Sequence, residues 1–322
     1  MRLLLLRGSV CKDRPWTEIE HKTIEEEDCI YIQMAYHLTE GDYGEVWLQG
    51  KPTRSVCYRP GFHVRWMKKI KHGHFLGGKP DVIIARGGFP MYDDVLKKFP
   101  KALKVRYGAG QRFLPSGFTD YQLLLVDATT QLITAKRMFP KIPVEFILKP
   151  APDNLIYPVD VPKKYDVCYI ANATQEKIKG IKWVYKTFPK DMTMLHLGFK
   201  PKRNHPGIRQ KRVLRHEIAK QISQCRVGII PYDTIDSMPR AMVEMMACGL
   251  PVVTFESVRY WKERYPAYPV PISHFWETVR SLTQDQDYEE NRQKYVDTLS
   301  MPKAIEHLQK VIEDARAYQR TA

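Results

Sequence analysis

The chain has 322 residues, of which 43% are apolar and 27% are charged, as in ordinary globular proteins. At about 150 residues per domain, this length indicates two domains, and the composition excludes a disordered chain, a collagen-like chain and a small disulfide scaffold. Lysine and arginine number 51 against 36 aspartate and glutamate residues. The formal net charge of +15 therefore favours an anionic partner.

No apolar stretch reaches the 18 or so residues that span a bilayer, and the leucine run that begins at Leu3 ends at Arg7. That run is shorter than the apolar region of a secretory signal. We therefore expect a cytoplasmic protein (host cytoplasm if the source is viral), with a peripheral membrane association as the alternative. The six cysteines are widely spaced without a CxxC pair, which favours reduced, buried thiols over disulfides or a metal site.

Strands and helices are expected to alternate along the first half of the chain. The apolar runs predict strands at residues 1–7, 45–48, 81–85, 103–107, 121–126 and 144–148. Helical spacing of apolar residues predicts helices at residues 25–38, 65–71, 92–99 and 130–138. Strands separated by helices of this length indicate βαβ units and a parallel sheet.

Four prolines between Lys149 and Lys163 predict a semi-rigid linker, because proline fixes φ and cannot donate to a sheet. The same alternation then resumes, with strands predicted at residues 166–170, 192–197, 227–230 and 251–255 and helices at residues 181–188, 213–225 and 240–247. From Pro302 onward the chain predicts an amphipathic helix with Ile305, Leu308, Ile312 and Ala315 on one face. The fold class is therefore α/β.

The stretch from Val227 to Thr254 carries the clearest chemical pattern. A buried strand ends at Pro231, a polar loop follows, and a helix begins near Pro239, which suits a first helical turn. Its unpaired N-terminal amides predict an anion site suited to a diphosphate. Asp236 precedes the helix and Glu244 follows eight residues later; a carboxylate is a natural acceptor for the hydroxyls of a sugar.

This stretch resembles the E-x7-E region of family 4 glycosyltransferases of the GT-B fold, usually written EGFP…LEAMACGxPVV. Here residues 236–239 read DSMP and residues 243–253 read VEMMACGLPVV, so aspartate replaces the first glutamate and serine the glycine. Residues 166–171 resemble the strand that opens the donor domain, and the lysines at 177 and 179 resemble the lysine that follows it. The resemblance covers roughly residues 149–270.

The resemblance implies two Rossmann-like domains that face a cleft. Residues 1–150 would form the acceptor-side domain and residues 151–301 the domain that binds a nucleotide-sugar donor. Residues 302–322 would form a C-terminal helix that packs back on the N-terminal domain. The cosubstrate would be a UDP- or GDP-sugar, with no bound cofactor and no metal, and transfer would retain the anomeric configuration.

The resemblance also implies roles for single residues. Glu244 would hold the donor ribose, Asp236 would contact the transferred sugar, and Lys177 or Lys179 would neutralise the leaving diphosphate. The family's arginine partner of that lysine appears here as Asn172, so Arg240 and Arg203 are candidates to replace it. The full set of donor-binding candidates is Gly8, Asn172, Gly198, Tyr232, Ser237, Met238, Pro239 and Arg240.

Basic residues gather between Lys51 and Arg112, where fifteen lysines and arginines face three aspartates, a local net charge of +12. Aromatic residues are interleaved with them, a pattern suited to a phosphate polymer such as DNA. An anionic membrane surface would use the same charges. The acceptor-binding candidates are Arg65, Lys68, Lys69, Arg86 and Arg112.

The leading hypothesis is thus a glycosyltransferase, with a polyanionic acceptor. A hydroxylated base in DNA, as in phage DNA glycosyltransferases, is the favoured acceptor, and a lipid-linked or lipopolysaccharide glycan at the inner membrane face is the alternative. A non-catalytic nucleic-acid-binding protein is the hypothesis from a different class. The oligomeric state is left open.

Overall fold

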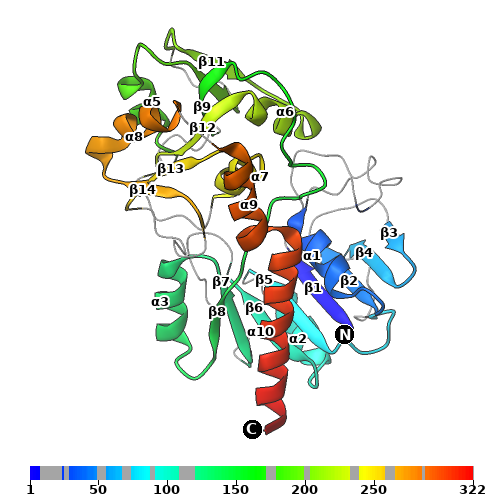
Figure 1. Ribbon diagram of the computed structural model, residues 1–322. Coiled ribbons are helices and arrows are strands. Elements are labelled where there is room, and N and C mark those ends of the chain that lie inside the picture. The colour runs from blue at the N-terminus through cyan, green and yellow to red at the C-terminus, as the bar shows by residue number, and fades with distance from the viewer. Residues whose placement is uncertain are drawn as a thin grey trace. The chain divides into compact units, whose positions relative to one another are not determined.

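The structure is a computed structural model, and it describes residues 1–7, 24, 29–48, 56–66, 74–87, 91–108, 120–171, 179–198, 204–232, 239–257, 265–284 and 287–321. The chain divides into two compact units. Unit 1 comprises Met1–Leu148 and Ala304–Ala322, and unit 2 comprises Lys149–Lys303. Each unit has its own sheet with helices against it (Figure 1), which confirms the predicted fold class of two parallel-sheet α/β domains.

Unit 1 contains an eight-stranded sheet in the order β3-β4-β2-β1-β5-β6-β7-β8. Every neighbouring pair is parallel except β3 and β4. The strands are β1 (Leu3–Arg7), β2 (Gly44–Leu48), β3 (Val56–Arg59), β4 (Phe62–Trp66), β5 (Val82–Arg86), β6 (Leu103–Tyr107), β7 (Leu123–Val126) and β8 (Val144–Phe146). The helices are α1 (Ile30–Leu38), α2 (Met91–Lys98) and α3 (Thr129–Met138).

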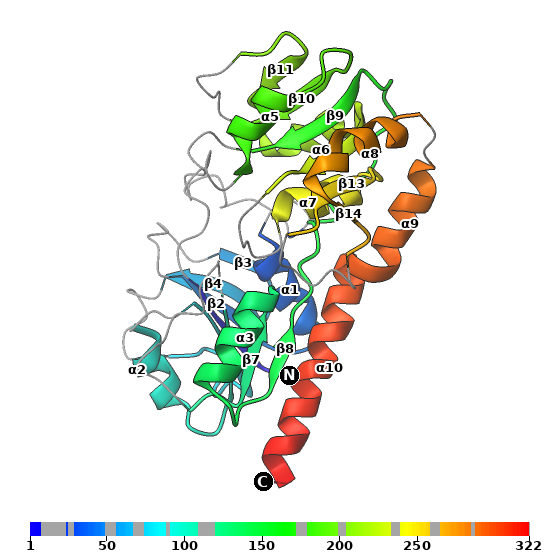
Figure 2. The same cartoon turned by 90° about the vertical axis from the view of Figure 1, so that its left-hand side faces the viewer.

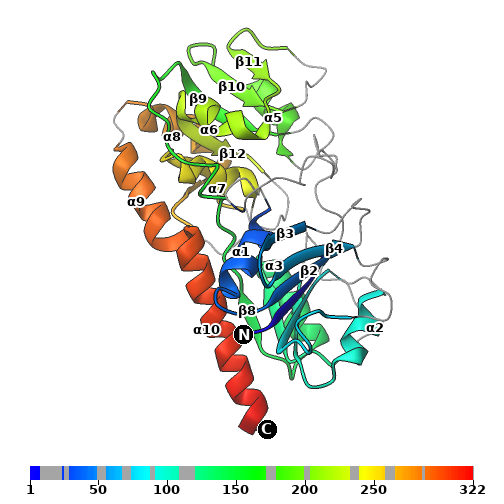
Figure 3. The same ribbon diagram turned by 90° about the vertical axis from the view of Figure 1, so that its right-hand side faces the viewer.

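The strand order reverses direction at β1. The chain leaves β1 toward β2 on one side and leaves β5 toward β6 on the other, and right-handed crossovers then place the connecting helices on opposite faces. Figures 2 and 3 show this arrangement, with α1 and α10 on one face of the sheet and α2 and α3 on the other. Open α/β sheets bind ligands beyond the carboxyl ends of the strands at such a reversal. The ends of β1 and β5 are therefore the expected ligand-binding edge of unit 1.

The helix predicted at residues 65–71 is wrong at its start, because β4 runs from Phe62 to Trp66. β3 and β4 form an antiparallel hairpin that turns at Gly61, whose φ of 84° lies in the left-handed region. Phe62 and Val64 are buried and alternate with less buried residues, which is the period of a strand. Residues 67–71 lie outside the described part of the chain.

Unit 2 contains a six-stranded parallel sheet in the order β11-β10-β9-β12-β13-β14. Its strands are β9 (Tyr165–Ile170), β10 (Met194–Leu197), β11 (Ile208–Lys211), β12 (Cys225–Ile230), β13 (Val252–Phe255) and β14 (Tyr268–Val270). Its helices are α5 (Ile181–Thr187), α6 (Ile218–Ser223), α7 (Arg240–Ala247), α8 (Phe275–Leu282) and α9 (Tyr288–Leu299). The helix predicted at residues 213–225 is shorter than expected, because Cys225 already belongs to β12.

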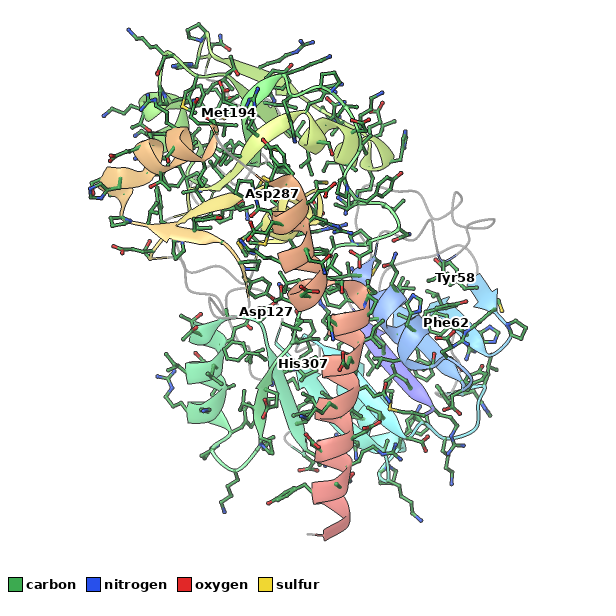
Figure 4. All side chains as sticks on the ribbon, in the orientation of Figure 1. Tyr58, Phe62, Asp127, Met194, Asp287 and His307 are labelled. Atoms are coloured by element: carbon green, nitrogen blue, oxygen red, sulfur yellow. The ribbon has the colours of Figure 1, made fainter. Side chains whose placement is uncertain are left out.

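The last helix, α10 (Met301–Thr321), begins in unit 2 and belongs to unit 1 from Ala304 onward. Leu308 and Ile312 are buried, and the ring of His307, labelled in Figure 4, donates from Nε2 to the carbonyl of Phe146 in β8 at 2.8 Å. Met301 N donates to Asp153 Oδ2 at 2.7 Å, so the carboxylate of the linker caps the start of α10. Within the described ranges, no helix combines the length and the apolar character needed to cross a bilayer.

Candidate functional site

The predicted donor residues that the structure describes lie along the carboxyl edge of the sheet in unit 2. Glu244 is on α7, the helix that connects β12 to β13, and only 3% of its surface is exposed. α7 begins at Arg240, directly after Pro239, whose extended backbone does not continue the helix. The first-turn amides of α7 therefore lie at the end of the loop that follows β12.

The Glu244 carboxylate is held by two arginines. Arg215 Nη1 and Arg240 Nε each donate to Oε1 over 2.7 Å. Arg240 is one helical turn before Glu244, whereas Arg215 comes from the 3₁₀ turn Arg215–Glu217 that precedes α6. Two guanidinium groups stabilise an ionised carboxylate in a site where burial would otherwise disfavour the charge. Both bonds end on Oε1.

A glycine turn brings Lys179 to the end of β12. Gly180 has a φ of 69°, and a Cβ added there would lie 2.1 Å from the carbonyl oxygen of Pro231. Only a glycine therefore allows the turn before α5 to approach the strand end this closely. The ammonium of Lys179 lies 4.1 Å from the ring centroid of the buried Tyr232, a cation–π contact. Lys179 and Tyr232, predicted separately from the sequence, are thus neighbours.

Gly198 follows β10 on the same edge of the sheet, with a φ of 148° that favours glycine. Its N–H donates to the carbonyl of Lys211 at 3.0 Å, so the residue closes the β10–β11 pair. Together, Lys179, Gly198, Tyr232, Pro239, Arg240 and Glu244 are the predicted catalytic and donor-binding residues within the described ranges. The predicted residues Gly8, Asn172, Lys177, Asp236, Ser237 and Met238 lie outside them, as does Arg203.

In unit 1, Arg65 is bound to a buried acid. Its Nη1 lies 3.0 Å from Glu45 Oε2, and Glu45 is fully buried. Glu45 also accepts hydrogen bonds from Trp47 Nε1 and from the N–H of Leu76, both at 2.5 Å. Arg65 therefore neutralises a buried carboxylate, which favours a structural role over acceptor binding.

The second described acceptor candidate, Arg86, is partly buried at the end of β5, with its guanidinium 4.3 Å from the ring centroid of Tyr31. Lys68, Lys69 and Arg112 lie outside the described residues. Two arginines that contact these sites were not predicted individually: Arg215, the last residue of a basic run from Lys200, and Arg7, which ends the leucine run of β1. The sequence indicates that Arg7 ends a strand and that Arg215 ends a basic run. It does not indicate that they contact Tyr31 and Glu244.

No protein-family model and no curated protein matches the sequence. Solved structures with the same fold were found. A sucrose-phosphate synthase from Thermosynechococcus elongatus matches with a TM-score of 0.66 at 12% identity, over 98% of this chain and 99% of that one. The lipopolysaccharide outer core galactosyltransferase WaaB matches with a TM-score of 0.64 at 8% identity, over 98% and 99%.

An α-glucosyltransferase in complex with UDP-glucose and DNA containing an abasic site matches with a TM-score of 0.62 at 13% identity, over 97% of this chain and 99% of that one. These proteins are glycosyltransferases of the GT-B fold. Because the similarity extends over nearly the whole length on both sides, the chain has the GT-B fold.

Proposed function

We propose that this protein is a glycosyltransferase that moves a sugar from a nucleotide diphosphate sugar to a hydroxyl acceptor. The observation that carries the proposal is the buried Glu244 in a chain of the GT-B fold, held by Arg240 of α7 and by Arg215 of the 3₁₀ turn before α6. The likeness to a structure that contains UDP-glucose supports a nucleotide sugar as the cosubstrate.

Each described group in unit 2 has a role in this proposal. Glu244 accepts the ribose hydroxyls of the donor through Oε2, because Oε1 already receives both arginines. The first-turn amides of α7 bind the diphosphate. Lys179 and Arg240 supply positive charge where negative charge develops on the leaving diphosphate, which lowers the barrier to breaking the sugar–phosphate bond.

The remaining assignments are proposals on residues outside the described ranges. Asp236 contacts the transferred sugar, Lys177 shares the role of Lys179, and Ser237 and Met238 contribute amides to the diphosphate. The reaction retains the anomeric configuration and uses no metal or bound cofactor.

The donor site is tested by titrating UDP and GDP into the protein in a calorimeter. Glu244→Gln should lower the affinity for the nucleotide about 10- to 100-fold, because a charge-assisted hydrogen bond contributes about 1.5–3 kcal/mol. Glu277→Gln, an exposed glutamate on α8 of the same unit, is the matched control and should leave the affinity unchanged. Equal nucleotide affinity in the wild type and Glu244→Gln would remove the donor assignment.

We propose a hydroxylated base in DNA as the acceptor. Such a base must leave the base stack of the duplex before its hydroxyl can reach the enzyme. The net charge of +12 between Lys51 and Arg112 supports an acceptor rich in phosphate. Incubation with hydroxymethylcytosine-containing DNA and a pool of nucleotide sugars, followed by nucleoside mass spectrometry, should show a gain of one pentose or hexose.

The second candidate acceptor is a lipid-linked or lipopolysaccharide glycan at the inner membrane face, which the likeness to WaaB favours. If the DNA gains no sugar while donor binding is confirmed in the same sample, this acceptor replaces DNA in the proposal. A non-catalytic nucleic-acid-binding protein is distinguished by Glu244→Ala: under our proposal this variant loses transfer and keeps its association with DNA or lipid.

A further inference from the structure

Two arginines stand side by side at the carboxyl edge of the sheet in unit 1. Arg7 ends β1 and Arg86 ends β5, and the two residues are directly paired in the parallel register. Arg86 is in turn paired with Tyr107, which ends β6. Residues in register on parallel strands point to the same face, so the three side chains form one row. This row lies where the strand order reverses.

The two guanidinium groups converge on one aromatic ring. The ring centroid of Tyr31 on α1 is 4.3 Å from the Arg86 guanidinium and 5.4 Å from that of Arg7. Arg7 is only 6% exposed and donates from Nη1 to Cys29 Sγ just before α1. The ring and the thiol fix the arginines in place but do not neutralise them.

The arginine pair lacks a counter-charge within the described part of the chain. No ion pair there joins Arg7 or Arg86 to a carboxylate, and the Nε atoms of both are buried without a hydrogen-bond partner. Two other arginines of unit 1 are paired: Arg2 with Asp81 and Arg65 with Glu45, each at 3.0 Å. Two adjacent, desolvated positive charges without an acid are costly unless an anion compensates them.

The nearby acid is engaged elsewhere. Asp127, labelled in Figure 4 just after β7, accepts a hydrogen bond at 2.8 Å from the hydroxyl of Tyr107. The hydroxyl of Tyr31 lies 3.1 Å from that of Tyr107. Since Tyr107 donates to Asp127, Tyr31 donates to Tyr107, and these two hydrogen bonds fix the hydroxyl end of the ring that both arginines contact. Both guanidinium groups are therefore fixed in position, and no ion pair in the described part of the chain balances their positive charge.

We propose that Arg7 and Arg86 bind a phosphoryl group of a substrate. A pair of planar guanidinium forks matches the oxygens of a phosphate, which accept two parallel hydrogen bonds from each fork. This inference rests on the proposed function in one respect: it takes the phosphoryl group to be part of the sugar donor or of the acceptor. The donor's diphosphate and a phosphodiester of the acceptor share this chemistry.

The test measures binding of UDP, GDP and a short single-stranded DNA oligonucleotide to the full chain by calorimetry at low salt. Arg86→Gln should weaken one of these two ligand classes at least tenfold. Arg86→Lys, which keeps the charge but loses the fork, should show an intermediate loss. Arg137→Gln, an exposed arginine on α3 of the same unit, should bind like the wild type. Unfolding temperatures show whether each of the three variants is folded.

A loss confined to the nucleotides identifies the donor diphosphate as the source of the phosphoryl group, and a loss confined to the oligonucleotide identifies the acceptor. Wild-type affinity for both classes in Arg86→Gln overturns the inference, as does a wild-type protein that binds neither. Should Arg86→Gln fail to fold, the same comparison is made with Arg86→Lys. Failure of the proposed function is separate: it appears as nucleotide affinity that Glu244→Gln does not change.

Discussion

His196 is a buried polar residue whose tautomer the structure determines. Its Nε2 lies 2.8 Å from the carbonyl of Ala171, and its Nδ1 lies 2.8 Å from the hydroxyl of Tyr185. A carbonyl can only accept, so Nε2 donates, and in the neutral ring, which burial favours, Nδ1 accepts from Tyr185. Burial lowers the pKa of His196 below its ordinary value of 6.5, against the opposing effect of the Ala171 bond.

This lowered pKa predicts a pH-dependent stability. The unfolded chain takes up a proton on His196 near pH 6.5 while the folded chain does not, so the stabilisation is complete above that pH and is lost as the pH falls. His196→Gln should flatten the dependence of the urea unfolding midpoint between pH 5 and pH 8. Identical slopes in the variant and the wild type would contradict the assignment.

At the scale of elements, the turn before α5 fixes the position of Lys179. Gly180→Ala should destabilise the protein by at least about 2 kcal/mol, because it combines a left-handed backbone with a contact to the Pro231 carbonyl that cannot be accommodated. It should also weaken UDP or GDP binding by moving Lys179 away from Tyr232. Urea unfolding and calorimetry measure the two effects.

Gly41→Ala is the matched control for this element. Gly41 has a similar φ of 79°, but a Cβ there would meet nothing within 4 Å. Its cost should be limited to the backbone conformation, about 1 kcal/mol, with nucleotide affinity unchanged. Equal losses of stability in the two alanine variants would show that the approach to Pro231 does not matter.

Elements also show what the sequence can and cannot predict. The alternation of strands and helices followed from periodicity, and the motif around Glu244 placed that residue on a helix after a strand. The helix predicted at residues 65–71 was wrong because Trp66 and its apolar neighbours fit a helical spacing, while the register that makes β4 a strand depends on pairing with β2. Such pairing is a tertiary property and leaves little trace in a local pattern.

The same reason explains the arginines that the sequence did not identify. Arg215 and Glu244 are 29 positions apart, and their contact depends on where the 3₁₀ turn before α6 lies relative to α7. Arg7 and Arg86 are neighbours only because β1 and β5 are adjacent in the sheet. Composition shows a surplus of basic residues, but strand order decides which of them meet.

At the scale of the whole molecule, α10 contributes to the core of unit 1 although it follows unit 2 in the sequence. Ile312 on α10 is fully buried, so Ile312→Ala should cost about 2–5 kcal/mol and lower the unfolding temperature. The exposed neighbour Lys310 provides the control, as Lys310→Ala should leave that temperature unchanged.

Both α10 variants should bind UDP or GDP like the wild type when folded, because none of the described residues proposed to bind the nucleotide, Arg7 and Arg86 included, lies on α10. Calorimetry below the unfolding temperature tests this separation. A large loss of nucleotide affinity in Ile312→Ala would show that the donor site depends on the core of unit 1.

Under the proposed function, the protein transfers a sugar from a nucleotide diphosphate sugar and needs Glu244 to do so. The most direct measurement incubates the protein with a pool of nucleotide sugars, hydroxymethylcytosine-containing DNA and a lipid extract, and follows every donor and acceptor by mass spectrometry. We predict that one donor is converted to its nucleoside diphosphate while one acceptor gains the sugar, with a loss of about 100-fold in Glu244→Ala and none in Glu277→Gln. Transfer that persists unchanged in Glu244→Ala, or a donor pool left intact by the wild type, would contradict this function.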